Sequence, residues 1–113
     1  MKSGSYIPDR GDIVWLNFTP QTGHEQRGMR PAIVLSPKIY NEKTYMCICF
    51  PITSKVKGYP FEIPLPQNFP ISGVILSDQI KNLDYTKRDI RFICKAPSSI
   101  IKLLQKNILA LIS

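Results

Sequence analysis

The sequence predicts a mainly β domain, built as a small, strongly bent antiparallel sheet or partly open barrel and followed by one C-terminal helix. Short runs of strand-forming residues recur at close spacing and are separated by turns rich in Pro, Gly and Asn. Helical periodicity is confined to the end of the chain, and no βαβ pattern or internal repeat is present. A chain of 113 residues corresponds to a single domain, 1–113, with one core.

The first half of the chain contains three expected strands. Residues 13–18 are apolar at nearly every position, which predicts a strand covered on both faces, and residues 31–36 predict a second buried strand. The intervening residues 19–30 form a long polar loop. Residues 37–43 predict a turn or a short helical piece, and residues 44–50 predict a third strand that ends at Pro51.

The second half begins with a polar connector, 52–60, followed by an alternating segment at 61–65 in which Pro64 favours an edge strand. A strand is expected at 73–76, continuing after a bend through 77–83, and the last at 91–95. Pro97 then opens a helix at its first position. Apolar residues at 101, 104, 108 and 111 form one helical face, and Ile100 and Leu103 widen it, either as a broad core face or toward a second subunit.

The bulk composition narrows the function classes. Fifteen Lys and Arg against eight Asp and Glu give a net charge of +7, which favours phosphate-rich partners, although a mildly basic protein needs no such partner. The three cysteines lack zinc-finger spacing and are expected to be reduced and mostly buried, as in a cytoplasmic protein. No run is long enough to span a bilayer, and residues 1–10 show no signal-peptide pattern.

The loop at 23–31 concentrates groups that can do chemistry. It contains the only histidine, His24, followed by Glu25, Gln26 and Arg27, and it ends with Arg30 and Pro31. Acid–base and phosphate-binding side chains on one long loop favour an active site, while the simpler alternative is a solvated hairpin loop.

Phosphodiester cleavage without a metal would suit these residues, because no acidic metal cluster is visible in the sequence. RNA carries its own nucleophile, the 2′-OH. Arg30 can hold the phosphate with its planar fork, Thr53 can donate a hydrogen bond to the same oxygens, and Glu25 or His24 can take the 2′-OH proton. Each side chain taken alone also has an ordinary structural role.

Several ordered motifs resemble the MazF/PemK/Kid family of toxin endoribonucleases, closest to the MazF branch. The resemblance covers nearly the whole chain, and it implies an SH3-like barrel with a C-terminal helix, acting as a homodimer. It also implies metal- and cofactor-independent, sequence-specific cleavage of single-stranded RNA at a short motif, which leaves a 2′,3′-cyclic phosphate and a 5′-hydroxyl. The motifs are 6–15, Gly23-His24-Glu25-Gln26, Arg30-Pro31-Ala32, Leu35-Ser36-Pro37, Pro51-Ile52-Thr53-Ser54, 57–62, Gly73-Val74 and Ser77-Asp78-Gln79.

The resemblance implies catalytic roles for Arg30 and Thr53 and a supporting role for Glu25. In the Kid branch a His, an Arg and an Asp are credited instead. His24 and Asp78 match that set, but Leu76 stands where that branch has its arginine.

Substrate contacts are expected from Gln26, Arg27, Lys57, Gln79 and Lys81, with Lys57 and Gln79 favoured over any aromatic residue. Tyr59, Phe61 and Tyr85 can stack on bases, although Tyr59 and Phe61 can also be core or barrel-rim residues. Further basic residues that can line the RNA path are Lys55, Lys87, Arg88 and Arg91.

The family resemblance also implies a MazE-like antitoxin whose acidic, disordered tail covers the basic surface. Two alternatives belong to other functional classes. One is a protein-binding inhibitor on the same scaffold, as in the topoisomerase poison CcdB, which lacks the Arg/Thr pair and ends in a tryptophan-containing tail. The other is a non-catalytic RNA-binding module.

Overall fold

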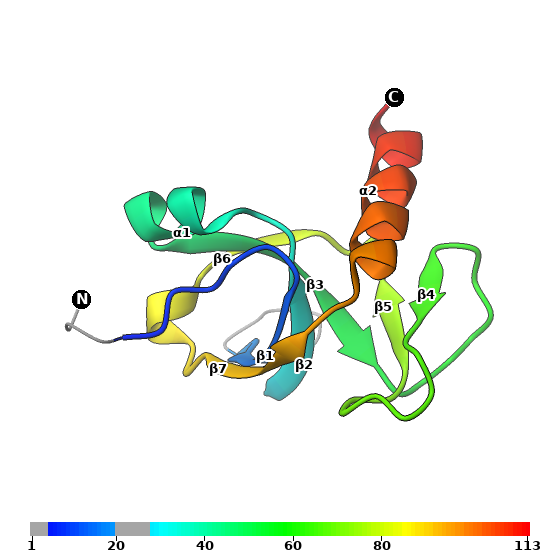
Figure 1. The fold of residues 1–113 in the computed structure, drawn as a ribbon, viewed down its shortest axis with the longest axis horizontal. Helices are drawn as coiled ribbons and strands as arrows, with labels where there is room; N and C mark the ends of the chain where they lie inside the picture. Colours follow the sequence, from blue (N-terminus) through cyan, green and yellow to red (C-terminus); the bar gives the residue numbers. More distant parts are fainter. Residues whose placement is uncertain (1–4, 20–27) are drawn as a thin grey trace.

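The computed structural model describes residues 5–19 and 28–113. In these residues a single bent antiparallel sheet has the strand order β4-β5-β3-β2-β1-β7, and β6 pairs with β3 beside this path, so the sheet does not close (Figure 1). The mainly β prediction is therefore confirmed. The elements are β1 (Asp12–Asn17), β2 (Met29–Val34), α1 (Lys38–Thr44), β3 (Met46–Thr53), β4 (Glu62–Pro64), β5 (Val74–Leu76), β6 (Lys81–Asp84), a 3₁₀ turn (Tyr85–Lys87), β7 (Arg91–Lys95) and α2 (Ser98–Ile112).

Both faces of the central strands are buried. Neighbouring residues of a strand point to opposite faces, so β1 contributes Ile13 to a core that α2 helps to cover and Val14 to a second core on the other face. This explains why the first run is apolar at almost every position. Trp15 is the exception to the expected two-sided burial, because 38% of its surface is exposed.

The third strand continues through Pro51, so the prediction that Pro51 ends it is wrong. One edge of β3 pairs first with β6, up to Cys49, and then with β5, from Ile52 onward. Pro51 lies in the gap between these two pairings. A residue without a backbone N–H removes no ladder hydrogen bond on that edge, and the strand can therefore pass through it.

The terminal helix buries a narrower face than its sequence predicts. Ile100 and Leu104 are its buried residues, so Ile100 belongs to the core instead of a surplus face. Leu103 is 41% and Leu111 45% exposed. The C-terminal half of α2 extends beyond the sheet (Figure 1), which is why Leu111 finds no core to cover.

The remaining elements agree with expectation within a few residues. Residues 37–43 lead into the short helix α1, β4 lies at the edge of the sheet, and β7 has the predicted bounds. The second strand begins and ends two residues earlier than predicted, and Pro97 is the N-cap of α2, one position before its first helical residue. Cys47 and Cys49 are buried free thiols, and Cys94 is half-buried. No helix in the described part of the chain has the length and apolarity needed to cross a membrane.

Candidate active site

Two neighbouring strands bring Arg30 and Thr53 together. The antiparallel pairing of β2 with β3 places Ala32 opposite Pro51. Extended by two residues, the same register sets Arg30 beside Thr53. Residues that are 23 positions apart in the sequence therefore meet at one end of the sheet.

Thr53 is the last residue of β3 and is held tightly there. Its side chain is almost buried, and Oγ1 accepts a hydrogen bond of 3.1 Å from the backbone N–H of Lys55. On the other side β5 pairs with it, so that Thr53 lies opposite Val74. Gly73 directly precedes Val74 and has a φ of +123°. A Cβ atom at Gly73 would lie 2.2 Å from the Thr53 carbonyl oxygen. Only glycine allows β5 to come this close.

Arg30 and Thr53 line one cavity of about 370 Å³, here called the Arg30 cavity. The strands β1, β2 and β3 contribute one wall and the loop before β5 contributes the other. Trp15 and the loop residues were not expected here from the sequence. The lining residues are Trp15, Met29, Arg30, Pro31, Ile52, Thr53, Ser54, Pro70, Ile71 and Ser72.

A second cavity of about 280 Å³, here called the Lys57 cavity, adjoins the first. Thr53 lines both cavities, which makes it the meeting point of two hollows. Two lysines, two carboxylates, an amide and two aromatic rings surround this second hollow. The lining residues are Thr53, Lys55, Lys57, Tyr59, Phe61, Glu62, Leu76, Asp78 and Gln79. We call the two cavities together the Thr53 site.

The other predicted residues divide into four groups. Lys57, Asp78 and Gln79 line the Lys57 cavity as a group, whereas Lys81 lies on β6, outside the lining of either cavity. Tyr85 is only 1% exposed, and its hydroxyl donates to the Asn41 carbonyl, so the expectation that it stacks on bases is wrong. The predicted site residues His24, Glu25, Gln26 and Arg27 lie outside the described residues.

The arrangement of the Thr53 site suits an anion. A guanidinium presents a planar set of donors that matches phosphate oxygens, and a neighbouring hydroxyl can donate to the same group. The adjoining cavity adds two lysines to the lining, together with two carboxylates. Within residues 5–19 and 28–113, no three His, Cys, Asp or Glu side chains are grouped so that they could hold a metal ion.

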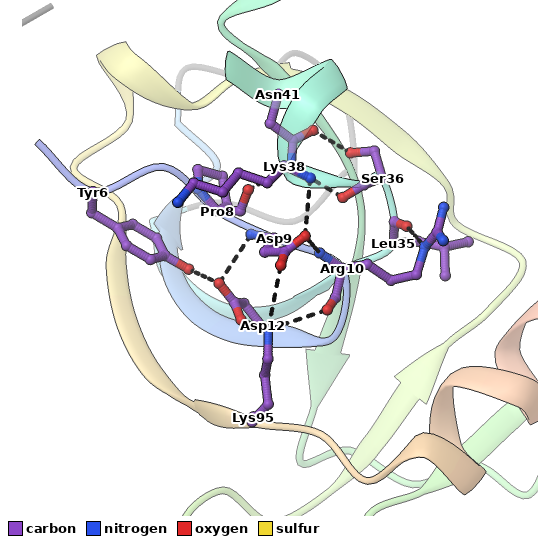
Figure 2. Close-up of polar contacts among 10 residues, drawn as sticks. All are labelled: Tyr6, Pro8, Asp9, Arg10, Asp12, Leu35, Ser36, Lys38, Asn41 and Lys95. Atoms are coloured by element: carbon purple, nitrogen blue, oxygen red, sulfur yellow. Dashed lines mark hydrogen bonds and ion pairs between the residues drawn. The ribbon is translucent and has the colours of Figure 1, made fainter.

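A separate group of charges, here called the carboxylate network, lies around Tyr6, Asp9, Asp12 and Lys95 (Figure 2). Asp12 is nearly buried and accepts hydrogen bonds from the Tyr6 hydroxyl and the Asp9 N–H, while Lys95 Nζ approaches its Oδ1 at 2.5 Å. Burial, the hydrogen bond to Asp12 and the nearby negative charge raise the pKa of Tyr6. The network ties the N-terminal segment to β1 and β7.

Asp9 completes the carboxylate network from the surface side. Its Oδ1 accepts hydrogen bonds from the N–H groups of Arg10 and Lys38, at 2.8 and 2.9 Å. Burial alone would raise the pKa of Asp9, but these amides and the nearby Lys95 outweigh it and lower that pKa. No sequence pattern indicates this network, because a carboxylate that folds back on its own chain has no distinctive spacing.

Comparison with known proteins gives a consistent result. The family model described as a PemK-like, MazF-like toxin of type II toxin–antitoxin systems matches residues 9–112. The chain is 51% identical, over 83 residues that make up 74% of each protein, to the endoribonuclease toxin MazF of Escherichia coli K12. It is 34% identical over 99 residues to the endoribonuclease toxin ChpB of the same organism, covering 83% of this chain and 84% of ChpB.

Solved structures agree with these sequence matches. The crystal structure of MazF from Deinococcus radiodurans superposes with a TM-score of 0.91 at 46% identity, covering 95% of this chain and 97% of that one. A MazE–MazF structure from the same organism gives a TM-score of 0.87 at 46% identity, covering 95% and 96%.

Proposed function

This chain belongs to the PemK-like, MazF-like toxin family of type II toxin–antitoxin systems, and we propose on that premise that it cleaves single-stranded messenger RNA without a metal. It is an endoribonuclease toxin whose activity stops translation and growth. One observation carries the chemical part of the proposal: Arg30 and Thr53, from adjacent strands, line the same cavity. The alternative of a CcdB-like protein-binding inhibitor is not favoured, because the matched relatives are endoribonucleases.

The reaction is an attack of the ribose 2′-oxygen on the adjacent phosphorus atom. The bond from phosphorus to the 5′-oxygen breaks, which leaves a 2′,3′-cyclic phosphate and a 5′-hydroxyl. Glu25 or His24 takes the proton of the 2′-OH, and the departing 5′-oxygen takes a proton from water or from a protonated side chain, so that the proton count balances. Asp78, which lines the neighbouring cavity, is a supporting candidate for these transfers.

Arg30 stabilises the charge on the phosphorane, together with the hydroxyl of Thr53. A guanidinium stays protonated at neutral pH, which makes it a poor proton donor or acceptor there. Its contribution is a fixed, preorganised positive charge with two parallel donors. The tight placement of Thr53 between β3 and β5 supports the same interpretation, because preorganised donors need not be reoriented during the reaction.

RNA reaches the phosphate site along the Lys57 cavity. Lys57 and Gln79 contact the substrate there, and Gln26, Arg27 and Lys81 extend the path. The net charge of +7 increases the rate of encounter with a polyanion. The same basic surface suits an acidic, disordered antitoxin tail, which would compete with RNA for it.

The cellular setting is proposed from the family. The toxin acts in the cytoplasm, where messenger RNA is available, as a homodimer that a MazE-like antitoxin inhibits. A complex of MazE with MazF is known for the Deinococcus radiodurans relative. Size-exclusion chromatography with light scattering tests the dimer, and a shift on adding a MazE-like antitoxin tests the complex.

The decisive experiment is cleavage of a long, protein-free single-stranded RNA in the presence of EDTA, with the cut ends mapped. We expect discrete cuts with 5′-hydroxyl ends on RNA and none on DNA of the same sequence, because DNA lacks the 2′-OH. The Thr53→Val variant is the matched control, since it keeps the shape of the side chain and removes the hydroxyl. Intact RNA with folded wild-type protein would contradict the proposal.

A further inference from the structure

The connector from residue 54 to 61, here called the 54–61 segment, supplies most of the wall of the Lys57 cavity. Lys55, Lys57, Tyr59 and Phe61 all line that cavity. Residues 54–60 are nonetheless exposed and belong to no strand or helix. Burial of apolar surface therefore contributes little to fixing their conformation, and polar contacts have to hold them.

The carboxylate of Glu62 holds the middle of this segment. It accepts hydrogen bonds from the backbone N–H groups of Lys57, at 3.1 and 3.2 Å, and of Gly58, at 2.9 Å. Gly58 has a φ of +80°, a left-handed conformation that glycine adopts without strain. Successive N–H groups around such a residue form a concave site for an anion. In this chain the anion is the protein's own carboxylate.

Other contacts fix the two ends of the segment. At its start, the N–H of Lys55 donates to Thr53 Oγ1. At its end, the Phe61 carbonyl accepts from the N–H and the hydroxyl of Ser77, and Asn107 of α2 donates to that hydroxyl at 3.1 Å. Between these anchors, the ammonium group of Lys57 lies 5.9 Å from the centre of the Tyr59 ring.

We propose that Glu62 is a positioning residue for RNA binding, which it serves by holding the 54–61 segment so that Lys57 and Tyr59 face the substrate. This inference rests on the proposed function. The direction in which RNA binding changes when the Glu62 charge is removed distinguishes this role from simple electrostatic repulsion. A carboxylate beside an RNA path repels phosphates, so removing its charge should strengthen binding unless the carboxylate is needed to shape the path.

The test compares Glu62→Gln with Glu42→Gln. Each substitution removes one negative charge, and Glu42 is exposed on α1 and lines neither cavity. In single-turnover cleavage, we expect Glu62→Gln to raise the half-saturating protein concentration about tenfold, since charge-assisted hydrogen bonds are about twice as strong as neutral ones. The rate at saturation should change little. Glu42→Gln should leave half-saturation unchanged or lower it.

A half-saturating concentration that falls or stays unchanged in Glu62→Gln would overturn the proposal. If Glu62→Gln does not fold, Glu62→Asp carries the test, because it keeps the charge and shortens the reach. Electrostatics alone predicts no change in that variant, whereas a positioning role predicts weaker RNA binding.

Amide hydrogen exchange of the RNA-free protein tests the positioning itself. The N–H groups of Lys57 and Gly58 should exchange faster in Glu62→Gln than in wild type and in Glu42→Gln, and equal rates would overturn the proposal. This measurement does not depend on cleavage. If wild-type protein leaves RNA intact but Glu62→Gln still exchanges these amides faster than wild type, the proposed function is refuted. The conclusion that Glu62 holds the 54–61 segment then still stands.

Discussion

The carboxylate network and the Thr53 site are both rich in charge, but they use it in opposite ways. In the network, Asp12 is 4% exposed, and its oxygens accept from Tyr6, the Asp9 amide and Lys95. In the Thr53 site, Lys55 and Lys57 are exposed around a hollow. The fold uses the first set of charges for its own contacts, whereas it presents the second set to solvent.

This difference separates stability from activity. A charge with protein partners lowers the free energy of the folded state, and its removal leaves the partner groups unsatisfied. A charge facing a solvent-filled hollow contributes little to folding and is available to a ligand. Substitutions in the network should therefore affect unfolding, and those in the Thr53 site should affect cleavage.

Arg30→Lys should give the largest effect and the sharpest form of the contrast. It keeps the positive charge and removes the planar fork, so we expect single-turnover cleavage to fall about 10²–10³-fold. Urea titrations of the variant check that cleavage is compared at equal amounts of folded protein. Near-normal cleavage by this variant would remove Arg30 from the proposed phosphate site.

Gly73→Ala should lower both stability and cleavage, because this glycine directly precedes β5 and lies against the Thr53 carbonyl. The new Cβ would lie 2.2 Å from the Thr53 carbonyl oxygen at a φ of +123°, so β5 has to move away from β3. We expect a loss of about 3 kcal/mol in the free energy of unfolding. Cleavage per folded molecule, measured at a temperature where the variant is folded, should fall as well.

Gly58→Ala is the stability control for that prediction. Gly58 also has a positive φ, but a Cβ atom added there would meet nothing within 4 Å. The variant should lose only about 1 kcal/mol. Equal losses in the two variants would show that backbone strain, and not the close approach to Thr53, limits substitution at Gly73.

Asp12→Ala should show the opposite behaviour to Arg30→Lys. It leaves the Tyr6 hydroxyl and the Asp9 amide without their acceptor, so the free energy of unfolding should fall by about 2 kcal/mol. Lys95 is half exposed and can be hydrated, which keeps the loss below that of a fully buried pair.

Denaturant titration of Asp12→Ala should be run beside Asp89→Asn, which removes the charge and keeps a residue type that tolerates the φ of +52° at this position. Asp89 forms an exposed ion pair with Arg91, whose removal should cost at most about 0.5 kcal/mol. Cleavage per folded molecule should match wild type in both variants. A selective loss of cleavage in Asp12→Ala would show that the network reaches the active site.

Tyr6→Phe should give the smallest effect, and this effect should be visible in the pH dependence of the free energy of unfolding. Because the folded protein raises the pKa of Tyr6, the associated stability is fully present below the unfolded value of about 10 and is lost as the pH rises further. Tyr6→Phe should lose about 1 kcal/mol at pH 7 and decline less steeply above pH 10. Burial also raises the pKa of Cys94, so some decline should persist.

Urea titrations at pH 7, 9 and 10.5 check this prediction, with Tyr45→Phe as the control for losing an exposed phenol. Parallel curves for wild type and Tyr6→Phe would contradict it. At low pH, the lowered pKa of Asp9 makes the free energy of unfolding change with pH in the opposite direction. Its contribution is present above the unfolded value of about 4 and disappears as the pH falls below that value.

Local patterns are sufficient to predict most strands, and the errors occur where distant segments decide the outcome. Pro51 predicts the end of a strand from sequence alone. Its actual effect depends on which strands pair with β3 before and after this residue. Leu111 has the right helical phase for the core, but periodicity does not reveal where the sheet beneath the helix ends.

In the Thr53 site, too, sequence motifs identify some residues, whereas others are recognised only from their positions in the folded chain. Arg30 and Thr53 are identified by the family resemblance, and the register of β2 and β3 explains their proximity. Ile71 and Ser72 escape prediction because only the folded chain brings the loop before β5 to the cavity. The role of Glu62 escapes it because this side chain binds backbone amides, which look the same in every sequence.

The central place of β3 has a consequence for the order of folding. This strand pairs with β2, which is near in sequence, and with β5 and β6, which are more distant. Because closing a longer loop has a larger entropic cost, the meander of β1, β2 and β3 should form first and provide the edge on which β5 and β6 assemble. Thr53 would then reach its final place only when β5 docks, so that the toxin becomes active only after the meander has formed.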